Sequence, residues 1–392
     1  MHATATSSPS RLTPEDELHW LALRLVPGLG TRRVVRLLER FQSPQLLFRA
    51  SVSELEAAGL PPGPARSVVS GCTFDDAVEQ QNKLRARGAV LVTIHDPLYP
   101  EPMRDILDPP LVLFARGDLA LLNYPGIAVV GTRKPTPYGM AVAEKLSGDL
   151  AAAGLNVISG MARGIDTASH RAALAVGGKT TAVFGCGVDM IYPSENRRIH
   201  EEISTKGLVI SEFPMGAPAY PQNFPIRNRI VSGMSCGVLV VEGAQYSGSA
   251  ITARLAMDQG REVYAIPGNI TSQASWGPNL LIRQGAKLVT TAQDIVNELS
   301  PEIRRRIQNG GGASNGNGPN SGPKQSTLPL GPNAVLGDLL LAKVTVDSPT
   351  HIDELLGCLE NYSSSEIVAV LFELELLGLV RQLPGKQFVK VW

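Results

Sequence analysis

Cysteine is scarce in this chain, with four residues among 392. Cys72, Cys186, Cys236 and Cys358 are far apart, form no C-x-x-C pair and have no histidine at metal-ligand spacing. A disulfide scaffold needs several closely spaced cysteines, and a structural zinc site needs paired cysteine or histidine ligands. The sequence therefore predicts neither kind of site, and we expect no bound metal.

Long apolar runs are also missing. No segment approaches the roughly 20 apolar residues that a membrane-spanning helix requires. Met1–Leu18 is polar and leans acidic, without the apolar stretch of a secretory signal peptide. We therefore expect a soluble cytoplasmic protein with no membrane partner.

An excess of positive charge is missing as well. The 36 Lys and Arg residues are balanced by 36 Asp and Glu residues, so the formal net charge is zero. Because a basic surface is the usual mark of a nucleic-acid-binding protein, this balance argues at first against such a partner. The argument weakens once the charge is counted by segment.

Composition divides the chain into four predicted parts. Residues 307–334 are rich in Gly, Asn, Ser and Pro, which predicts a flexible linker. A helical domain over 1–80 and a larger domain over 81–306 precede the linker, and a small domain over 335–392 follows it. Their formal charges in chain order are −1, +4, +1 for the linker and −4. A polyanion is therefore expected to bind the 81–306 domain.

The 81–306 domain alternates short β-rich runs with helical patterns. The predicted strands are Ile127–Gly131, Leu155–Gly160, Thr180–Gly187, Leu208–Glu212, Gly237–Glu242 and Val263–Gly268. The predicted helices are Pro137–Ala153, Asp166–Val176, Ser194–Thr205 and Ser249–Gln259. This rhythm predicts an α/β fold with a Rossmann-like, doubly wound, mostly parallel sheet. Ligands of such sheets bind beyond the carboxyl ends of the strands.

The N-terminal domain contains two glycine turns. Val26–Thr31 runs into a helical pattern over Arg32–Phe41, and Gly59–Ala65 is a degenerate second copy of the turn. Two such copies predict a small domain of the sterile-alpha-motif or helix-hairpin-helix kind. Arg32, Arg33 and Arg36 could make a weak phosphate contact there, although the surroundings are near neutral.

The C-terminal domain has the element order of a winged helix. Thr350–Leu359 predicts one helix, and Ser363-x-x-Glu366 is a capping box that opens a second helix over Ile367–Leu377. Leu379–Leu383 and Gln387–Val391 then predict a β-ribbon.

The second of these helices lacks the residues that read DNA. A recognition helix needs Lys, Arg, Asn or Gln on its outer face, whereas this one offers Glu366, Glu373 and Glu375. We therefore interpret the winged helix as a protein-contact module.

Two familiar cofactor motifs are absent. No G-x-G-x-x-G follows a predicted strand, and no Walker A lysine motif exists. The sequence therefore predicts no nicotinamide or ATP cofactor. The first strand instead leads into Gly131-Thr132-Arg133, where the glycine lets an anion approach the backbone and the arginine can grip a phosphate. The alternative is a tight turn with a solvated arginine.

The next strand end repeats this pattern. Ser159, Gly160, Arg163 and Gly164 suit a second phosphate. We expect the following Asp166 to cap the helix that carries His170, and we interpret His170 as a buried structural histidine rather than a general base.

Phe224-Pro-Ile-Arg227-Asn228-Arg229 combines an aromatic ring with two arginines. Such segments bind single strands, because the ring stacks on a base while the guanidinium groups hold phosphates. The alternative is that one arginine pairs with a carboxylate such as Glu212 or Glu242. Ser247-Gly248-Ser249 adds a further helix start that suits a phosphate, beside Tyr246.

The ordered motifs resemble those of the DNA-processing protein A family, also called DprA or Smf. They are Tyr99-Pro100, Asp108-Pro-Pro110, Gly131-Thr-Arg133, Ser159-Gly-x-Ala-x-Gly-Ile-Asp166 with His170, Tyr192-Pro193, Ser211-Glu212, Phe224-Pro-x-Arg-Asn-Arg229, Ser247-Gly-Ser249 with Thr252, and Pro267-Gly268. The resemblance covers about 200 residues of the 81–306 domain.

The resemblance implies a non-catalytic homodimer that binds single-stranded DNA during natural transformation, protects it and helps load the RecA recombinase, with single-strand-binding protein as a further partner. The DNA-binding positions it implies are Gly131, Thr132, Arg133, Ser159, Gly160, Arg163, Gly164, Phe224, Arg227, Asn228, Arg229, Ser247, Gly248 and Ser249, with helix-start amides around Thr132 and Gly248. The dimer and RecA-facing surface it implies contains Leu280, Leu281, Ile282 and Leu288.

Two other functions compete with this one. A nucleotide enzyme, such as a phosphoribohydrolase on the same kind of sheet, could use the same strand ends, with His170, Asp166 or Glu242 as acid or base. It would need a paired nucleophile that the sequence does not display. A double-strand-specific regulator would use residues 335–392, whose acidic balance argues against duplex DNA binding.

Overall fold

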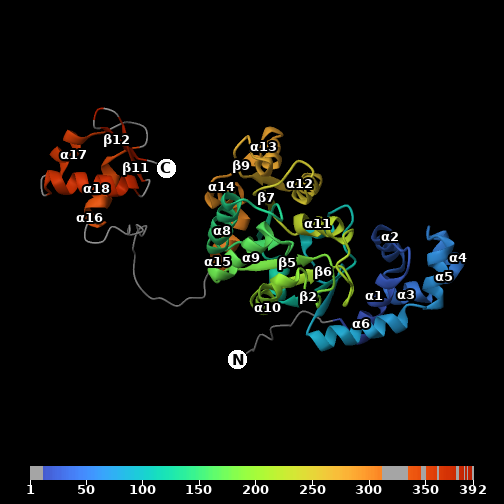
Figure 1. Ribbon diagram of the computed structural model, residues 1–392. Helices are drawn as coiled ribbons and strands as arrows, with labels where there is room; N and C mark the ends of the chain where they lie inside the picture. The colour runs from blue at the N-terminus through green and yellow to red at the C-terminus, as the bar shows by residue number, and fades with distance from the viewer. Residues whose placement is uncertain are drawn as a thin grey trace, which may run out of the picture. The chain divides into compact units, whose positions relative to one another are not determined.

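The computed structural model describes residues 12–310, 334–345, 350–359, 362–376, 379–383, 385 and 387–390. The chain forms two compact units, Met1–Ala313 and Ser314–Trp392. The first unit contains a large α/β domain and a group of N-terminal helices (Figure 1). We describe each unit by itself.

A nine-stranded sheet in the order β1-β2-β6-β5-β4-β3-β7-β8-β9 forms the centre of the first unit. Its strands are β1 Val90–Thr93, β2 Val112–Gly117, β3 Gly126–Val130, β4 Asn156–Ser159, β5 Thr180–Phe184, β6 Leu208–Ser211, β7 Gly237–Val240, β8 Glu262–Ala265 and β9 Lys287–Leu288. The strands from β3 to β9 pair in parallel, which confirms the predicted Rossmann-like fold. β1 and β2, which the sequence analysis did not predict, extend one edge in antiparallel register.

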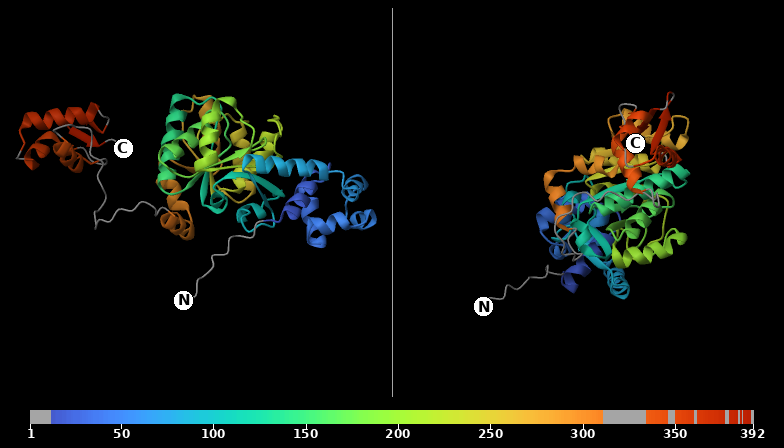
Figure 2. Two further views of the ribbon diagram at one scale, coloured as in Figure 1. Left: turned by 90° about the horizontal axis from the view of Figure 1, so that it is seen from below. Right: turned by 90° about the vertical axis from the view of Figure 1, so that its left-hand side faces the viewer.

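Helices cover both faces of this sheet (Figure 2). They are α7 Glu101–Arg104, α8 Pro137–Ala152, α9 Ile165–Ala175, α10 Arg197–Lys206, α11 Asn223–Gly233, α12 Gly248–Asp258, α13 Trp276–Arg283, α14 Ala292–Glu298 and α15 Pro301–Gly310. One apolar core lies beneath α8 and α9, and a second lies beneath α11 and α12. Strands that are buried on both faces are therefore largely apolar, as the sequence pattern indicated, although β5 begins with two threonines.

The chain reverses direction across the sheet between β3 and β7. From β3 it proceeds to β4, β5 and β6 on one side, and β7 then returns to pair with the other edge of β3. Adjacent strands whose connections leave in opposite directions form a crevice at their carboxyl ends, where open α/β sheets bind ligands. The topology therefore directs attention to the loops after β3 and β7.

Over the described residues from 12 onward, six helices precede the sheet, and α6 leads from this group to the α/β domain (Figure 1). They are α1 Pro14–Leu25, α2 Thr31–Phe41, α3 Pro44–Arg49, α4 Val52–Ala57, α5 Pro62–Ser70 and α6 Phe74–Arg87. Each predicted glycine turn precedes a helix, and the helix-hairpin-helix assignment stays a prediction. The expected boundary at residue 80 falls inside α6, because one apolar core continues from Trp20 and Leu84 to the sheet.

The second unit has its own core and a three-stranded sheet. Its elements are α16 Ala334–Lys343, β10 Thr350–His351, α17 Ile352–Cys358, α18 Ser364–Leu376, β11 Val380–Leu383 and β12 Gln387–Lys390. The capping box is confirmed, since the amide of Glu366 donates to Ser363 Oγ and the amide of Ser363 donates to the Glu366 carboxylate. Thr350 and His351 pair with β12 rather than opening a helix, which corrects the predicted start of α17.

The predicted linker begins too early. Residues 307–310 continue α15, because Ile307 is an apolar residue that packs into the core beneath α8. The remaining predicted linker positions before Ala334 lie outside the described residues. None of the described helices combines the length and hydropathy that crossing a bilayer requires.

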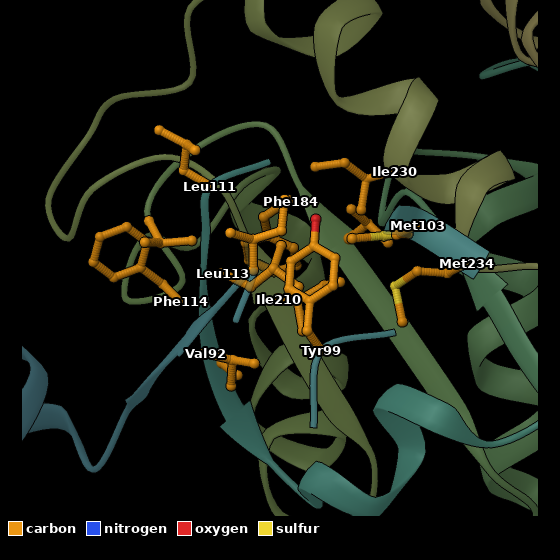
Figure 3. Close-up of a cluster of buried hydrophobic side chains, with 14 of the residues drawn as sticks. Val92, Tyr99, Met103, Leu111, Leu113, Phe114, Phe184, Ile210, Ile230 and Met234 are labelled. Carbon is orange, nitrogen blue, oxygen red and sulfur yellow. The ribbon is translucent and has the colours of Figure 1, made fainter. Parts of the chain in front are cut away.

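The core beside β2 contains side chains from distant segments. Figure 3 shows Leu113, Phe184 and Ile210 from three strands next to Tyr99 and Ile230. The buried hydroxyl of Tyr99 donates to Pro110 O at 2.8 Å, so the segment that precedes β2 is attached to this core.

A buried ion pair joins α11 to the end of β6. The Arg229 guanidinium donates from Nη2 to Glu212 Oε2 at 2.8 Å, and a second bond joins Nη1 to Oε1. Its Nε donates to Asp108 O at 2.8 Å. This confirms the alternative in which one arginine of the pair binds Glu212.

Removing the carboxylate should destabilise the fold. We expect Glu212→Ala to lower the free energy of unfolding by about 3–5 kcal/mol in urea denaturation, because a buried guanidinium loses its partner. Glu195→Ala, which removes the carboxylate of the exposed pair with Arg163, should leave the midpoint nearly unchanged. Equal midpoints for Glu212→Ala and the unchanged protein would contradict a stabilising role for this pair.

Candidate single-strand-binding cavity

A cavity of about 480 Å³ lies at the carboxyl ends of β3 and β7. Predicted site residues that line it are Gly131, Thr132, Arg133, Gly160, Phe224, Arg227, Asn228, Ser247, Gly248 and Ser249. They come from the loops after β3 and β4 and from the starts of α11 and α12. The fold therefore brings together segments that are more than a hundred residues apart.

Four predicted residues do not line this cavity. Ser159 is fully buried and donates to Val129 O at 2.6 Å. Gly164 has φ +77, and a Cβ there would lie 2.4 Å from Thr132 O, so this glycine shapes the start of α9. Arg229 is bound to Glu212. These three positions serve the fold, and we remove them from the candidate site.

Arg163 is the fourth of these residues. Its side chain is 58% exposed, and its Nε donates to Glu195 Oε1 at 2.7 Å. The pKa of Glu195 is lowered to about 2, first by this hydrogen bond from Arg163. A phosphate would have to displace Glu195 to reach the guanidinium.

Two guanidinium groups contact the ring of Phe224. The Cζ of Arg133 is 5.5 Å from the centre of its ring, and the Cζ of Arg227 is 6.0 Å away. On another side the Tyr192 ring lies 5.3 Å from it at an interplanar angle of 33°. Tyr192 is 39% exposed, so the two rings form a partly exposed aromatic surface.

Sequence reasoning did not assign a binding role to Tyr192. The available signal was an aromatic residue in the loop that follows β5, at the ligand-binding edge of the sheet. Lys134 was also missed, although it follows Arg133 directly and lines the cavity.

Arg227 forms the floor of the cavity and is only 4% exposed. Its Nη1 donates to Gly160 O at 2.6 Å and also to Val183 O. Burial lowers the pKa of Arg227 to about 10, although the nearby Asp166 opposes the shift. A Cβ at Gly160 would lie 2.5 Å from this guanidinium, so a larger residue there would displace the Arg227 side chain.

Asp166 organises the loop after β4. Its Oδ2 accepts from the amides of Gly160 at 3.1 Å and Ala162 at 3.2 Å. Burial raises the pKa of Asp166, and Arg227 acts in the opposite direction. The expected capping role is therefore wrong, because Asp166 lies inside α9 and binds the preceding loop, while Gly164 is the residue at the cap.

A protein carboxylate occupies the start of α8. Glu242 accepts from the Thr136 amide at 2.9 Å and from its hydroxyl at 2.6 Å. The Thr132 amide donates to Glu242 O at 2.8 Å. The amides of Thr132 and Thr136, near the predicted helix start, are therefore already bonded to Glu242 and are not free to bind a phosphate.

The start of α12 differs from that of α8. Ser247 caps it by accepting from the Ala250 amide at 3.3 Å, and its Oγ lies 2.8 Å from Ser249 Oγ. Gly248 is exposed, and a Cβ there would meet open space. Within the described chain, the amides of Gly248 and Ser249 have no acceptor, so they can bind a phosphate at a helix start.

His170 does not line the cavity. It is fully buried, and its Nδ1 lies 2.7 Å from Thr180 Oγ1. Because that hydroxyl donates to Val157 O, Nδ1 is the donor toward it. Burial is the main reason that the pKa of His170 is lowered to about 3. The prediction of a buried structural histidine is confirmed.

The described residues contain no group of three or more His, Cys, Asp or Glu side chains that could hold a metal ion. The positively charged groups that line the cavity are Arg133, Lys134 and Arg227. The cavity therefore combines cations and amide donors with the aromatic ring of Phe224.

The predicted dimer surface is only partly exposed. Leu281 is 8% exposed and packs in the core, while Leu280 and Ile282 are half-buried. Leu288 on the edge strand β9 is 51% exposed, and Trp276 at the start of α13 is 42% exposed.

The buried histidine predicts a loss of stability in acid. Below about pH 6.5 the unfolded chain protonates His170, while the folded protein does so only near the lowered pKa of about 3. Stability is therefore lost as the pH falls across this window, by about 2 kcal/mol at pH 5. His170→Asn keeps a donor toward Thr180 but cannot titrate, so in urea denaturation it should lose about 2 kcal/mol less between pH 7 and pH 5. An identical loss in both proteins would contradict the assignment.

Comparison with protein families and known proteins places these features in context. A family model described as DNA recombination-mediator protein A matches residues 90–300, and one described as the DprA winged helix domain matches residues 330–386. DNA processing protein DprA of Streptococcus pneumoniae is 46% identical over 206 residues, which cover 53% of this chain and 73% of that protein. Protein Smf of Synechocystis is 32% identical over 407 residues, which cover 95% of this chain and 98% of that protein.

A solved structure extends the similarity to the fold. The X-ray structure of DNA processing protein A from Streptococcus pneumoniae superposes with a TM-score of 0.63 at 36% identity, and covers 74% of this chain and 99% of that chain. Sequence and fold agree over the domain that carries the cavity. The chain therefore belongs to the DNA recombination-mediator protein A family, also called DprA or Smf.

Proposed function

We propose that this protein binds single-stranded DNA in the cavity at the carboxyl ends of β3 and β7. The observation that carries the proposal is the Phe224 ring, which has the Arg133 and Arg227 guanidinium groups within 6.0 Å and the Tyr192 ring at its side. A base can stack on the aromatic surface, and exposed cations beside it can hold the flanking phosphates. Stacking needs no particular base, so the binding is independent of sequence.

The electrostatics of the cavity support a phosphate ligand. Arg133 is exposed and has no carboxylate partner in the described structure. Lys134 and the free amides at the start of α12 lie around the same cavity. Phosphates near these groups release counterions, so binding should weaken with salt.

Membership of the family supports a role in the processing of DNA. The family description is a recombination mediator, and the relatives are named DNA processing proteins. We infer that in the cytoplasm this chain protects single-stranded DNA during natural transformation and helps load RecA, as a non-catalytic homodimer that also meets single-strand-binding protein. We assign the dimer and RecA-facing surface to α13 and β9.

The nucleotide-enzyme alternative loses its main support. Its candidate acids and bases were His170, Asp166 and Glu242. His170 is buried away from the cavity, Asp166 binds two loop amides, and Glu242 binds Thr136. These contacts support structural roles for the three groups, although Asp166 also lines the DNA cavity.

We retain the winged helix as a protein-contact module. On α18 the exposed face carries Glu366, Glu373 and the apolar side chains of Val368 and Phe372, which are 48% and 60% exposed. Such a face suits a protein better than the phosphates of duplex DNA.

Removing the aromatic ring should weaken DNA binding. We expect Phe224→Ala to weaken binding of fluorescent oligo(dT) by about 1–3 kcal/mol in an anisotropy titration, because one stacked base is lost. Phe224→Tyr keeps the ring and should bind almost as the unchanged protein does. If both variants bind equally well, the ring takes no part in binding.

Removing the exposed cation should change the salt dependence. Arg133→Ala should reduce the slope of log K against log salt by about 0.7, the value for one phosphate contact on a single strand. Arg171→Ala removes an exposed arginine of α9 that does not line the cavity, and should leave the slope unchanged. Equal slopes for both variants would exclude a phosphate at Arg133.

The dimer surface can be tested with matched substitutions. Leu288→Asp should shift the protein toward monomer in sedimentation velocity, because a charge would be buried in the interface. Val176→Asp is the control, since Val176 at the end of α9 is also 51% exposed. A dimer that survives Leu288→Asp would contradict the assigned surface.

A further inference from the structure

A second cavity, of about 650 Å³, lies at the opposite end of the sheet. Pro125, which directly precedes β3, and Cys236, which directly precedes β7, both line it. The amino ends of these two strands therefore frame this cavity, whereas their carboxyl ends frame the DNA cavity. We call it the amino-end cavity.

Three arginines line the amino-end cavity: Arg104, Arg261 and Arg306. Each is held by a backbone carbonyl: Arg104 by Asp96 O at 2.7 Å, Arg261 by Pro102 O at 2.8 Å and Arg306 by Asn123 O at 2.7 Å. In the described part of the chain, none of the three has a carboxylate within 4.0 Å, in contrast to Arg163 and Arg229. Their positions are fixed while their charges stay unneutralised, which suits an anionic ligand.

Two buried polar groups in the cavity wall also lack partners. Arg261 Nε and Tyr124 Oη are inaccessible to water and have no hydrogen-bond partner among the described residues. Buried polar atoms are normally satisfied, so each such atom calls for an explanation. Glu101 is the one carboxylate that lines the cavity, and it is exposed.

Much of the rest of the wall is aliphatic, beside Asn123, Ser235 and Cys236. It includes Pro97, Pro102, Pro125, Leu122, Met234 and Ile303. Figure 3 shows Met234 beside Tyr99, which also lines this cavity. An apolar group on the ligand could pack against these side chains.

Each of the two tyrosine rings in the wall contacts a cation. The Arg104 Cζ lies 5.3 Å from the centre of the Tyr99 ring, and Lys179 Nζ lies 4.5 Å from the centre of the Tyr124 ring. Tyr99 is 1% exposed. The buried Tyr99 ring therefore offers no face on which a nucleobase can stack, whereas Tyr192 beside Phe224 is 39% exposed.

We propose that the amino-end cavity binds an acidic peptide, a segment of a partner protein that carries carboxylates next to an apolar side chain. The carboxylates bind the guanidinium groups of Arg261 and Arg306, and the apolar side chain packs against the proline and aliphatic wall. Charge complementarity selects the acidic partner, and the buried Tyr99 ring gives a nucleobase no face for stacking. The protein could then hold a single strand and an acidic protein at opposite ends of one sheet.

The test uses the full-length protein and a fluorescein-labelled peptide of three aspartates followed by two leucines with a free carboxyl terminus. Arg306→Ala should weaken its binding by about five- to tenfold in an anisotropy titration, the effect of losing one charge-assisted contact. Arg305→Ala removes the neighbouring exposed arginine of α15, which does not line the cavity, and should bind as the unchanged protein does. Phe224→Ala should also leave peptide binding unchanged, which separates this site from the DNA cavity.

Two control ligands distinguish an acidic peptide from a neutral peptide and from a nucleotide. A peptide with asparagines in place of the aspartates should bind at least about fivefold more weakly, because the charge contacts are lost. Thymidine monophosphate should not displace the acidic peptide. No peptide binding, equal weakening by Arg305→Ala and Arg306→Ala, or displacement by the nucleotide would each overturn the proposal.

Discussion

Arg227 is a cation that the fold buries without an ion pair, and the DNA cavity depends on it. Within the described residues no carboxylate lies within 4.0 Å of its guanidinium, which is instead held by Gly160 O and Val183 O. Burial lowers the pKa of Arg227, and the negative charge of Asp166 raises it in opposition. The Asp166 carboxylate binds the amides of Gly160 and Ala162, and Arg227 of α11 donates to Gly160 O. The loop after β4 and helix α11 are therefore held together. Phe224 lies on the same helix as Arg227, and the centre of its ring is 6.0 Å from the Arg227 Cζ.

Although the chain has equal numbers of acidic and basic residues, several of its carboxylates are bound to groups of the protein itself. Glu212 neutralises the buried Arg229, Glu242 satisfies the start of α8, and Glu195 pairs with Arg163. Among the described residues, Arg133, Lys134 and Arg227 around one cavity and Arg104, Arg261 and Arg306 around the other have no such partner. A net charge of zero therefore coexists with local surfaces that favour anions, and the total says little about the ligands.

Much of the fold could be predicted from sequence, because apolar runs that end in glycine are strong signals for buried parallel strands. The sequence could not predict which arginines face the ligand and which are bound to carboxylates of the protein itself. The sequence analysis did not recognise that Asn223–Gly233 is a helix, in which Phe224 and Arg227 share a face while Arg229 points away toward Glu212. The partners of Arg229, Asp166 and Glu242 are distant in sequence or lie in irregular loops, so only the folded chain shows which polar groups are already bonded.

The central claim is that a base of single-stranded DNA stacks on the aromatic surface formed by Phe224 and Tyr192. Its most direct test is ultraviolet cross-linking of the full-length protein to an oligonucleotide that contains 5-iododeoxyuridine, followed by mass spectrometry of the joined peptides. The account predicts cross-links at Phe224 or Tyr192, which lie 5.3 Å apart between ring centres. Cross-links confined to the second unit or to the amino-end cavity would contradict it.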